Sequence, residues 1–428
     1  DLHVSADNRF ELYCDEQYVG MGPDRSDLEH WSFHTYRLEL GAGQHQLEAE
    51  VHYLGLSARH RPWAQTCIEP GFVLVAEGSP VDLNTGSAPW RVTRLKGVGT
   101  EMINLKAFLV VGPCYTIDAA QYFNPPEPVE PVAVQGAGDH SESGKIMPGW
   151  KLYPTRMPEQ TREPVAGGTI RRVTDIGPDE TFPDKDLTDA PVPAAAWQSL
   201  IDQKDSVTVP ANTRLVVLWD LDEYRTAYPQ LTTTGGAGSK VSLDWAEACY
   251  ETPLDVGKGK SPHHKGDRDA AAGKYFRGDG DAFLPDGPTR TMKAFWWRAG
   301  RYVRITVQTG DEPLTIDKLH LLESRMPLEN ESVFKSDDDA LPNVIQIATR
   351  GIQMCAHETY MDCPYYEQMM YTGDTRLQML IAYVMSPEDR LNQRGLELFD
   401  WSRQETGFVH ERYPSQPKQL SLTFSMIW

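Results

Sequence analysis

The chain has 428 residues, of which 40% are hydrophobic and 24% charged, a balance that is typical of globular proteins and argues against global disorder. This length predicts about two to four domains. The net charge of −20 argues against nucleic acids and anionic membrane surfaces as partners, because both require a basic protein surface. No apolar stretch approaches the roughly 20 residues of a membrane span.

Residues 1–115 have the pattern of an N-terminal β-sandwich. Residues 10–14 alternate between apolar and polar side chains, Asp15 and Glu16 turn the chain, and a second strand follows over 17–23. This is the pattern of a β-hairpin. Another strand is predicted over 46–53, and short strands separated by glycine and proline favour a sandwich.

Residues 116–185 are expected to form an extended connecting segment. Four prolines between 123 and 131 exclude a helix and a central strand there. A flexible tether is the alternative.

Residues 186–328 predict a second β-sandwich, with strands over 213–219, 240–245 and 302–307. Acidic pairs at 267–269 and 279–281, and the two histidines at 263 and 264, are weak metal signals because they lack the spacing of a known site. We therefore expect no metal ion or other cofactor.

The apolar period changes to that of helices within residues 329–428. The first helix has its apolar side chains on one face at the following positions: Val344, Ile347, Ala348, Gly351 and Cys355. A second helix is predicted from Asp374, and a third from Ser386 to about Glu405.

Three carboxylates stand close together in the segment between the first two helices. Asp362, Glu367 and Asp374 lie among tyrosines, methionines and a proline. Carboxylates in apolar surroundings are costly, because burial disfavours the charged form. Such a group indicates binding of a polar ligand or proton transfer. Helix capping by Asp374, and a solvated loop for the other two acids, are the structural alternatives.

The spacing of this segment resembles a family signature. Asp362-Cys363-Pro364, an acid at 367 and Thr372-Gly373-Asp374 resemble the motif of the α-L-rhamnosidases of glycoside hydrolase family 78. Tyr371 stands where that family commonly has Trp, and Tyr366 where it commonly has Arg, so the chain departs from the family motif at these two positions.

The resemblance implies a multidomain β + α architecture. Two antiparallel, jelly-roll-like β-sandwiches, the first carbohydrate-binding-like, would precede an (α/α)6 catalytic barrel that begins near residue 329. It also implies a periplasmic or extracellular location, with the cytoplasm left open.

The implied reaction is inverting hydrolysis of a terminal α-linked L-rhamnose from a rhamnose-containing glycan or glycoside. By position, Glu367 matches the general acid, and its charged neighbours would favour its protonated form. The expected sugar-binding residues are Asp362, Asp374, Tyr366 and Tyr371. An inverting enzyme also needs a second carboxylate, about 6.5–9.5 Å away, that activates water.

Residues 329–428 are expected to form only the first helices of such a barrel. The family's general base comes late in the barrel, so we expect it outside this chain, with Glu405 and Glu411 as weak candidates within it. The chain alone would then be inactive and would expose apolar helix faces.

Three alternatives remain open: an (α/α)6 glycosidase for another sugar, a non-catalytic carbohydrate-binding protein, and a structural protein with the same fold. The binding alternative would use tryptophans that stack on sugar rings, although core packing is their ordinary role. The candidates are Trp31, Trp63, Trp90, Trp219, Trp245, Trp296 and Trp297.

Overall fold

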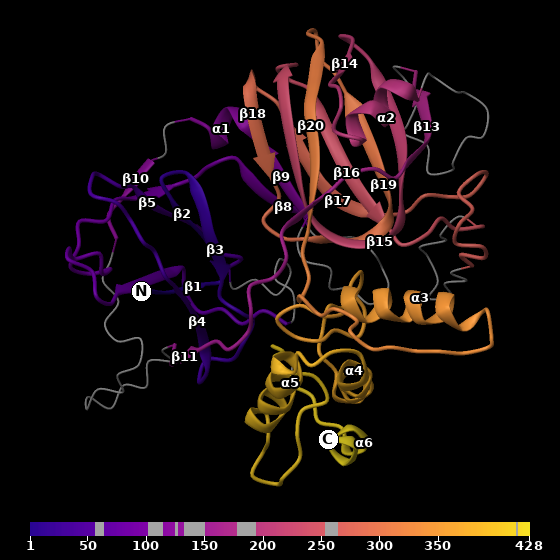
Figure 1. Ribbon diagram of the computed structural model, residues 1–428. Helices are drawn as coiled ribbons and strands as arrows, with labels where there is room; N and C mark the ends of the chain where they lie inside the picture. The colour runs from indigo at the N-terminus through magenta and orange to yellow at the C-terminus, as the bar shows by residue number, and fades with distance from the viewer. Residues whose placement is uncertain are drawn as a thin grey trace.

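The computed structural model describes residues 1–55, 64–101, 114–124, 127–131, 150–177, 194–252, 264–416 and 418–428. The N-terminal strands lie beside a large β-sheet unit, and the helices of the last hundred residues lie below it (Figure 1). This is the predicted order of β-rich parts followed by helices.

The N-terminal part contains two small sheets, with strand orders β11-β4-β1-β6 and β3-β2-β5. The hairpin predicted around Asp15 and Glu16 is confirmed: both residues have positive φ, 50° and 65°, as a tight primed turn between twisted strands requires. The strands are β1 (Leu2–Asp7), β2 (Arg9–Cys14), β3 (Gln17–Gly22), β4 (Trp31–Tyr36), β5 (Leu47–His52), β6 (Gly71–Ala76) and β11 (Leu152–Pro154). Strands β7 (Val92–Arg94) and β10 (Glu127–Val129) pair separately.

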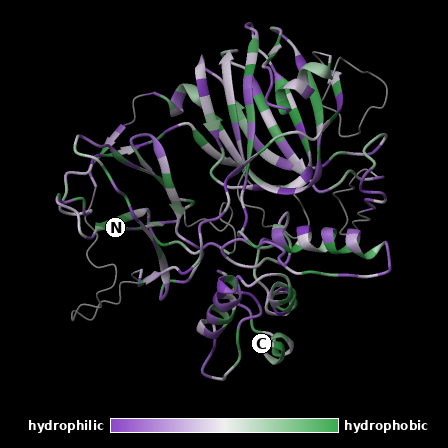
Figure 2. Cartoon of the chain, in the orientation of Figure 1, coloured by the Kyte–Doolittle hydropathy of each residue, from purple (hydrophilic) through white to green (hydrophobic). Residues whose placement is uncertain are grey.

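The large sheet contains the remaining strands. They are β8 (Val98–Glu101), β9 (Cys114–Asp118), β12 (Glu163–Val165), β13 (Thr169–Asp175), β14 (Val207–Val209), β15 (Arg214–Gly235), β16 (Lys240–Ala246), β17 (Asp279–Leu284), β18 (Gly287–Lys293), β19 (Arg298–Gln308) and β20 (Leu314–Glu323). Figure 2 shows hydrophobic residues along these strands. The predicted strands at 213–219, 240–245 and 302–307 lie in β15, β16 and β19.

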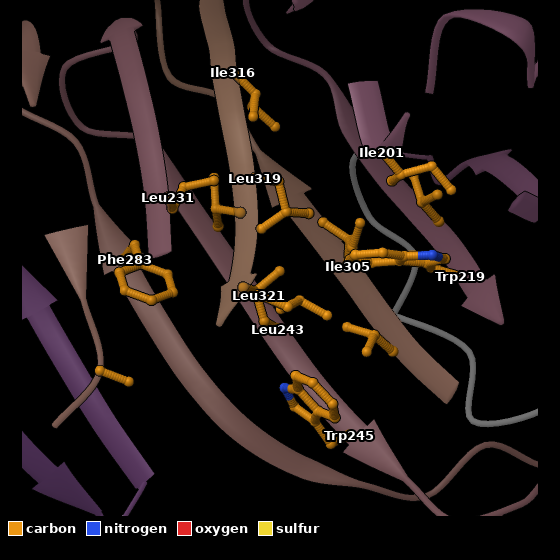
Figure 3. Packing of buried hydrophobic residues seen from close by; sticks show 14 of the residues in the cluster. Ile201, Trp219, Leu231, Leu243, Trp245, Phe283, Ile305, Ile316, Leu319 and Leu321 are labelled. Atoms are coloured by element: carbon orange, nitrogen blue, oxygen red, sulfur yellow. The ribbon is translucent and has the colours of Figure 1, made fainter. Parts of the chain in front are cut away.

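Strand β15 connects two layers of this unit. Its first part pairs with β13 and β19, and its last part with β18 and β20. The register breaks between Asp220 and Arg225, which bends the strand so that it passes from one layer to the other. Trp219, Trp245 and Phe283 are fully buried in the core between the layers (Figure 3).

Strand pairing crosses the boundaries that we expected at 115 and 185. Strands β8 and β9 join the large sheet, and β9 pairs in parallel with β17. Within the expected connecting segment, β11 pairs with β4 of the N-terminal part, whereas β12 and β13 pair in the large sheet. The segment therefore ties the two β-rich parts together through backbone hydrogen bonds.

Six helices occur in the described residues: α1 (Ala119–Tyr122), α2 (Ala195–Ile201), α3 (Leu341–Met354), α4 (Thr372–Met385), α5 (Arg390–Trp401) and α6 (Leu422–Ile427). Helix α3 is held to the large sheet by Arg350, which donates to the carbonyl oxygen of Tyr224 (2.8 Å) and pairs with Glu323 (2.6 Å). None of the described helices is long and apolar enough to cross a bilayer.

The predicted limits of the third helix are wrong at both ends. Helix α5 begins at Arg390 and ends at Trp401, not at Ser386 and Glu405. Ser386 instead ends α4, and its Oγ accepts the backbone N–H of Glu388 (3.2 Å) in a local turn. At the other end, Oγ of Ser402 accepts the N–H of His410 (3.0 Å), so the chain turns away four residues early.

The predicted apolar face of α3 points to solvent, and so do several apolar side chains of α4. Ile347 of α3 is 73% exposed and Val384 of α4 is 77% exposed. The buried side of α4 carries Met379, Ala382 and Met385 instead. The exposed apolar side chains of these two helices are Val344, Ile347, Leu377, Leu380, Ile381, Tyr383 and Val384.

Candidate active site

The acidic segment is anchored to the large sheet. Met361 and Tyr365 are buried in that sheet's core. The hydroxyl of Tyr365 donates to the carbonyl oxygen of Trp245 at the end of β16 (2.7 Å) and accepts the N–H of Asp279 (3.3 Å). The loop that connects α3 to α4 is thus positioned by both the helices and the sandwich.

Asp362 closes this loop on itself. Its backbone N–H donates to the carbonyl oxygen of Met369 (2.9 Å), and its Oδ1 accepts the N–H of Met369 (3.2 Å). Its Oδ2 accepts the thiol of Cys363 (3.1 Å). Burial, together with the charge of Glu367, raises the pKa of Asp362 to about 6, so this acid titrates near neutrality.

Glu367 lies at the tip of the closed loop. Its backbone φ is +20° and that of Gln368 is +53°. Residues other than glycine rarely adopt such positive φ values. Its Oε2 accepts a hydrogen bond from the hydroxyl of Tyr371 (2.5 Å), and Nη1 of Arg412 donates to the same hydroxyl oxygen (3.2 Å). The carboxylate therefore has a fixed direction.

Asp374 is the third residue of α4, and the helix is capped at Tyr371 without a side-chain bond. The predicted role of Asp374 as the first residue of that helix is therefore wrong by two residues. Burial raises the pKa of Asp374, and the charge of Glu367 raises it further. Asp362 and Asp374 thus both lie within electrostatic reach of Glu367, as expected for one carboxylate cluster.

Tyr366 faces the large sheet. Its hydroxyl lies 3.1 Å from the hydroxyl of Tyr250, and Nζ of Lys265 lies 5.8 Å from its ring centre. Lys265 pairs with Glu247 (2.6 Å). Sequence reasoning did not place Glu247, Tyr250 or Lys265 at the site, because they are more than a hundred residues away in the chain and form no motif with it.

The two acids considered as general bases differ in position. Glu411 lies beside the site and pairs with Arg412 (3.4 Å), and its carbonyl oxygen accepts the N–H of Thr372 (2.9 Å). Glu405 is exposed in the turn after α5. In the parts of the chain that the structure describes, no group of three or more His, Cys, Asp or Glu side chains could hold a metal ion.

The fold and the cluster define a class: β-sandwich parts followed by helices, with a carboxylate site at the junction. Within this class, residues 329–428 match the family model of the bacterial alpha-L-rhamnosidase 6 hairpin glycosidase domain. The rhamnosidase resemblance predicted from the motif is confirmed for residues 329–428, and the rhamnosidase structures described next share the fold of the chain.

Solved structures share the fold. The family 78 rhamnosidase of Bacillus sp. GL1 matches with a TM-score of 0.75 at 14% identity, over 100% of this chain and 62% of its own. An alpha-L-rhamnosidase from Streptomyces avermitilis, complexed with L-rhamnose, matches with a TM-score of 0.61 at 15% identity, over 97% and 36%. The enzyme from Aspergillus terreus gives 0.59 at 13% identity, over 97% and 42%.

This chain thus spans less than two thirds of each of these relatives. A comparison with curated protein sequences gives no match.

Proposed function

We propose that the protein is an inverting α-L-rhamnosidase that releases terminal α-linked L-rhamnose from glycans or glycosides. The observation that carries this proposal is the carboxylate cluster around Glu367, inside the segment that matches the rhamnosidase domain. The rhamnose bound to the Streptomyces relative supports the choice of sugar.

Glu367 is the general acid of this proposal. Its carboxyl proton passes to the glycosidic oxygen while the bond from that oxygen to the anomeric carbon breaks, and the aglycone leaves as an alcohol. The hydrogen bond from Tyr371 (2.5 Å) orients the carboxyl group for this transfer. The charges of Asp362 and Asp374 would stabilise the oxocarbenium-like transition state and hold sugar hydroxyls.

Water attacks the opposite face of the anomeric carbon and loses its proton to a second carboxylate, which inverts the configuration. We assign this base to no described residue. Glu411 is engaged by Arg412 (3.4 Å), and Glu405 is exposed in a turn outside the loop.

The proposed architecture is that of two jelly-roll-like sandwiches followed by the first helices of an (α/α)6 barrel, with domains at 1–115, 186–328 and 329–428 and a connecting segment at 116–185. Strands β8, β9, β12 and β13, which precede residue 186, add to the second sandwich. Figure 1 is compatible with this order, and the shared strands described above connect the parts.

The binding alternative loses its main support. Five of the seven candidate tryptophans are buried, namely Trp31, Trp219, Trp245, Trp296 and Trp297. Trp90 packs on the N-terminal core and donates to the carbonyl oxygen of Leu83 (2.9 Å), and Trp63 lies outside the described residues. Buried rings are unavailable for stacking on a sugar.

A panel of nitrophenyl glycosides, assayed with the full-length protein, tests the substrate. We expect hydrolysis of the α-L-rhamnoside, with β-L-rhamnose as the first product seen by proton NMR. Faster hydrolysis of another sugar would favour the other (α/α)6 glycosidases, and α-L-rhamnose as the first product would contradict the inverting mechanism.

A further inference from the structure

Gln368, the residue immediately after Glu367, is hydrogen-bonded by residues from two other parts of the molecule. Gln368 is 1% exposed, and three of its groups have partners. Its carbonyl oxygen accepts from Nη1 of Arg25 (2.8 Å), and its side-chain Oε1 accepts from Nε1 of Trp296 (2.9 Å). Its Nε2 donates to the carbonyl oxygen of Pro364 (3.0 Å).

Arg25 comes from the N-terminal part and uses three nitrogens at this junction. Besides Gln368, it donates through Nε to Oε1 of Glu358 (2.8 Å) and through Nη2 to Oγ1 of Thr359 (2.9 Å). Arg25 is 5% exposed and Glu358 1% exposed. A guanidinium with three fixed and buried contacts has one orientation only.

The partner of Arg25 is itself firmly held. Glu358 also accepts from Arg9 (3.3 Å) and from Nε2 of Gln160 (2.8 Å). Arg9 lies over the ring of Trp296, with its guanidinium carbon 4.6 Å from the ring centre. The two contacts to Gln368, from Arg25 and from Trp296, therefore belong to one buried network that joins the N-terminal part, the large sheet and the loop.

This network acts on a backbone that would otherwise relax. Glu367 and Gln368 both have positive φ, and such a conformation persists only where the surroundings determine it. The direction of the Glu367 carboxyl group depends on that backbone, because Tyr371 fixes only its far end.

We propose that Arg25 and Trp296 are positioning residues for Glu367: they hold Gln368 and thereby keep the left-handed turn that aims the acid at the glycosidic oxygen. Neither residue is proposed to touch the sugar. This inference rests on the proposed function, since it assumes that Glu367 is the proton donor.

Leaving-group dependence separates this role from a merely structural one. A dinitrophenolate departs from the anomeric carbon without a proton, whereas a phenolate needs one. A misaimed acid therefore slows hydrolysis of phenyl α-L-rhamnoside but not of the dinitrophenyl rhamnoside. A variant that is partly unfolded instead loses activity on both substrates to the same extent.

The variants are Trp296→Phe, which removes the indole N–H and leaves a smaller aromatic ring, and Arg25→Lys, which keeps the charge but loses the planar guanidinium group. For each we expect kcat on the phenyl rhamnoside to fall about 10- to 100-fold, with KM little changed, and kcat on the dinitrophenyl rhamnoside to stay within about twofold. Trp219→Phe is the matched control. It removes an equally buried indole N–H bonded to the carbonyl oxygen of Gly167 (3.0 Å) and should leave the ratio of the two rates unchanged.

Glu367→Gln, assayed on the same pair of substrates, distinguishes a failure of the positioning role from a failure of the proposed function. In one outcome, Glu367→Gln lowers kcat on the phenyl rhamnoside selectively, whereas Trp296→Phe and Arg25→Lys lower kcat on both substrates equally or on neither. This outcome overturns the positioning role and leaves the proposed function standing. If Glu367→Gln lowers kcat on both substrates equally, or on neither, Glu367 is not the proton donor. The positioning role and the proposed function are then both overturned.

Discussion

The hydroxyl of Tyr371 donates a hydrogen bond of 2.5 Å to Oε2 of Glu367. Arg412 donates to the same hydroxyl oxygen (3.2 Å), so the phenol links a cation to the carboxylate. Burial, and next the bond to Glu367, hold the pKa of Tyr371 well above its ordinary value, so the hydroxyl remains a donor at every working pH.

The first prediction concerns this bond. Tyr371→Phe keeps the ring over which Arg412 lies but removes the donor, so Glu367 loses its orienting partner. We expect kcat on a phenyl α-L-rhamnoside to fall about 10-fold or more, measured by steady-state kinetics. Tyr383→Phe, at an exposed position of α4, is the control, and an equal effect of both variants would contradict the role of Tyr371.

The second prediction is a pH dependence of stability from Asp362. Burial raises the pKa of its carboxyl group from 3.8 to about 6, so the folded state binds this proton more tightly than the unfolded state. The stability from this group is complete below about pH 4 and declines as the pH rises to about 6. The decline amounts to no more than about 3 kcal/mol.

Asp362→Asn removes this decline. Relative to the wild type, the variant should therefore become more stable between pH 4 and pH 7, as measured by thermal unfolding at both values. Asp311→Asn, in an exposed turn before β20, should change nothing. A constant difference between Asp362→Asn and the wild type at both pH values would refute the buried, titrating carboxyl.

Local sequence patterns correctly predicted the features of the structure that depend on interactions between residues close together in the chain. The turn at Asp15 and Glu16 and the carboxylates of the 362–374 segment were found because their signals lie within a few residues. The limits of α5 were not, because Ser386 and Ser402 form side-chain turns that compete with the helix pattern.

Contacts between residues far apart in the chain could not be predicted, because they leave no local pattern in the sequence. The bond from Arg25 to Gln368 joins residues 343 apart, and that from Trp296 to Gln368 joins residues 72 apart. Each of these residues alone has an ordinary structural explanation. Only the fold shows that they meet beside Glu367, and that Lys265 and its partner Glu247 lie near Tyr366.

The third prediction concerns the buried ion pair of Glu358. Burial alone would raise the pKa of its carboxyl group, but Arg25 and then Arg9 hold it well below the ordinary value of 4.5. Glu358→Gln leaves two buried cations without a counter-charge, so we expect the free energy of unfolding to fall by about 3–5 kcal/mol at pH 7.

The sign of the pH dependence is opposite to that of Asp362. The charged form of Glu358 stabilises the folded state above about pH 4.5, and this contribution is lost as the pH falls through the folded-state pKa. Thermal unfolding at pH 7 and pH 3 should show the difference between Glu358→Gln and the wild type shrinking at the lower value. A difference that is absent at pH 7 would show that the pair contributes nothing.

The fourth prediction concerns the exposed apolar faces of α3 and α4. Apolar patches of this kind promote association. Val384→Glu, at a position 77% exposed, should reduce concentration-dependent association of this chain in light scattering and leave the melting temperature unchanged. Val81→Glu adds the same charge at another exposed valine, 61% exposed; an equal reduction by both would mean that charge alone, not the apolar face, matters.

The most direct test of the account is the activity of Glu367→Gln in the full-length protein. Glutamine keeps the shape of the side chain and its contact with Tyr371 but has no acidic proton to transfer to the leaving group. We expect the wild-type protein to hydrolyse a phenyl α-L-rhamnoside. For Glu367→Gln we expect kcat/KM on the same substrate to fall by about 10²- to 10⁴-fold. Hydrolysis by Glu367→Gln at the wild-type rate would contradict the assignment of the proton donor and, with it, the site.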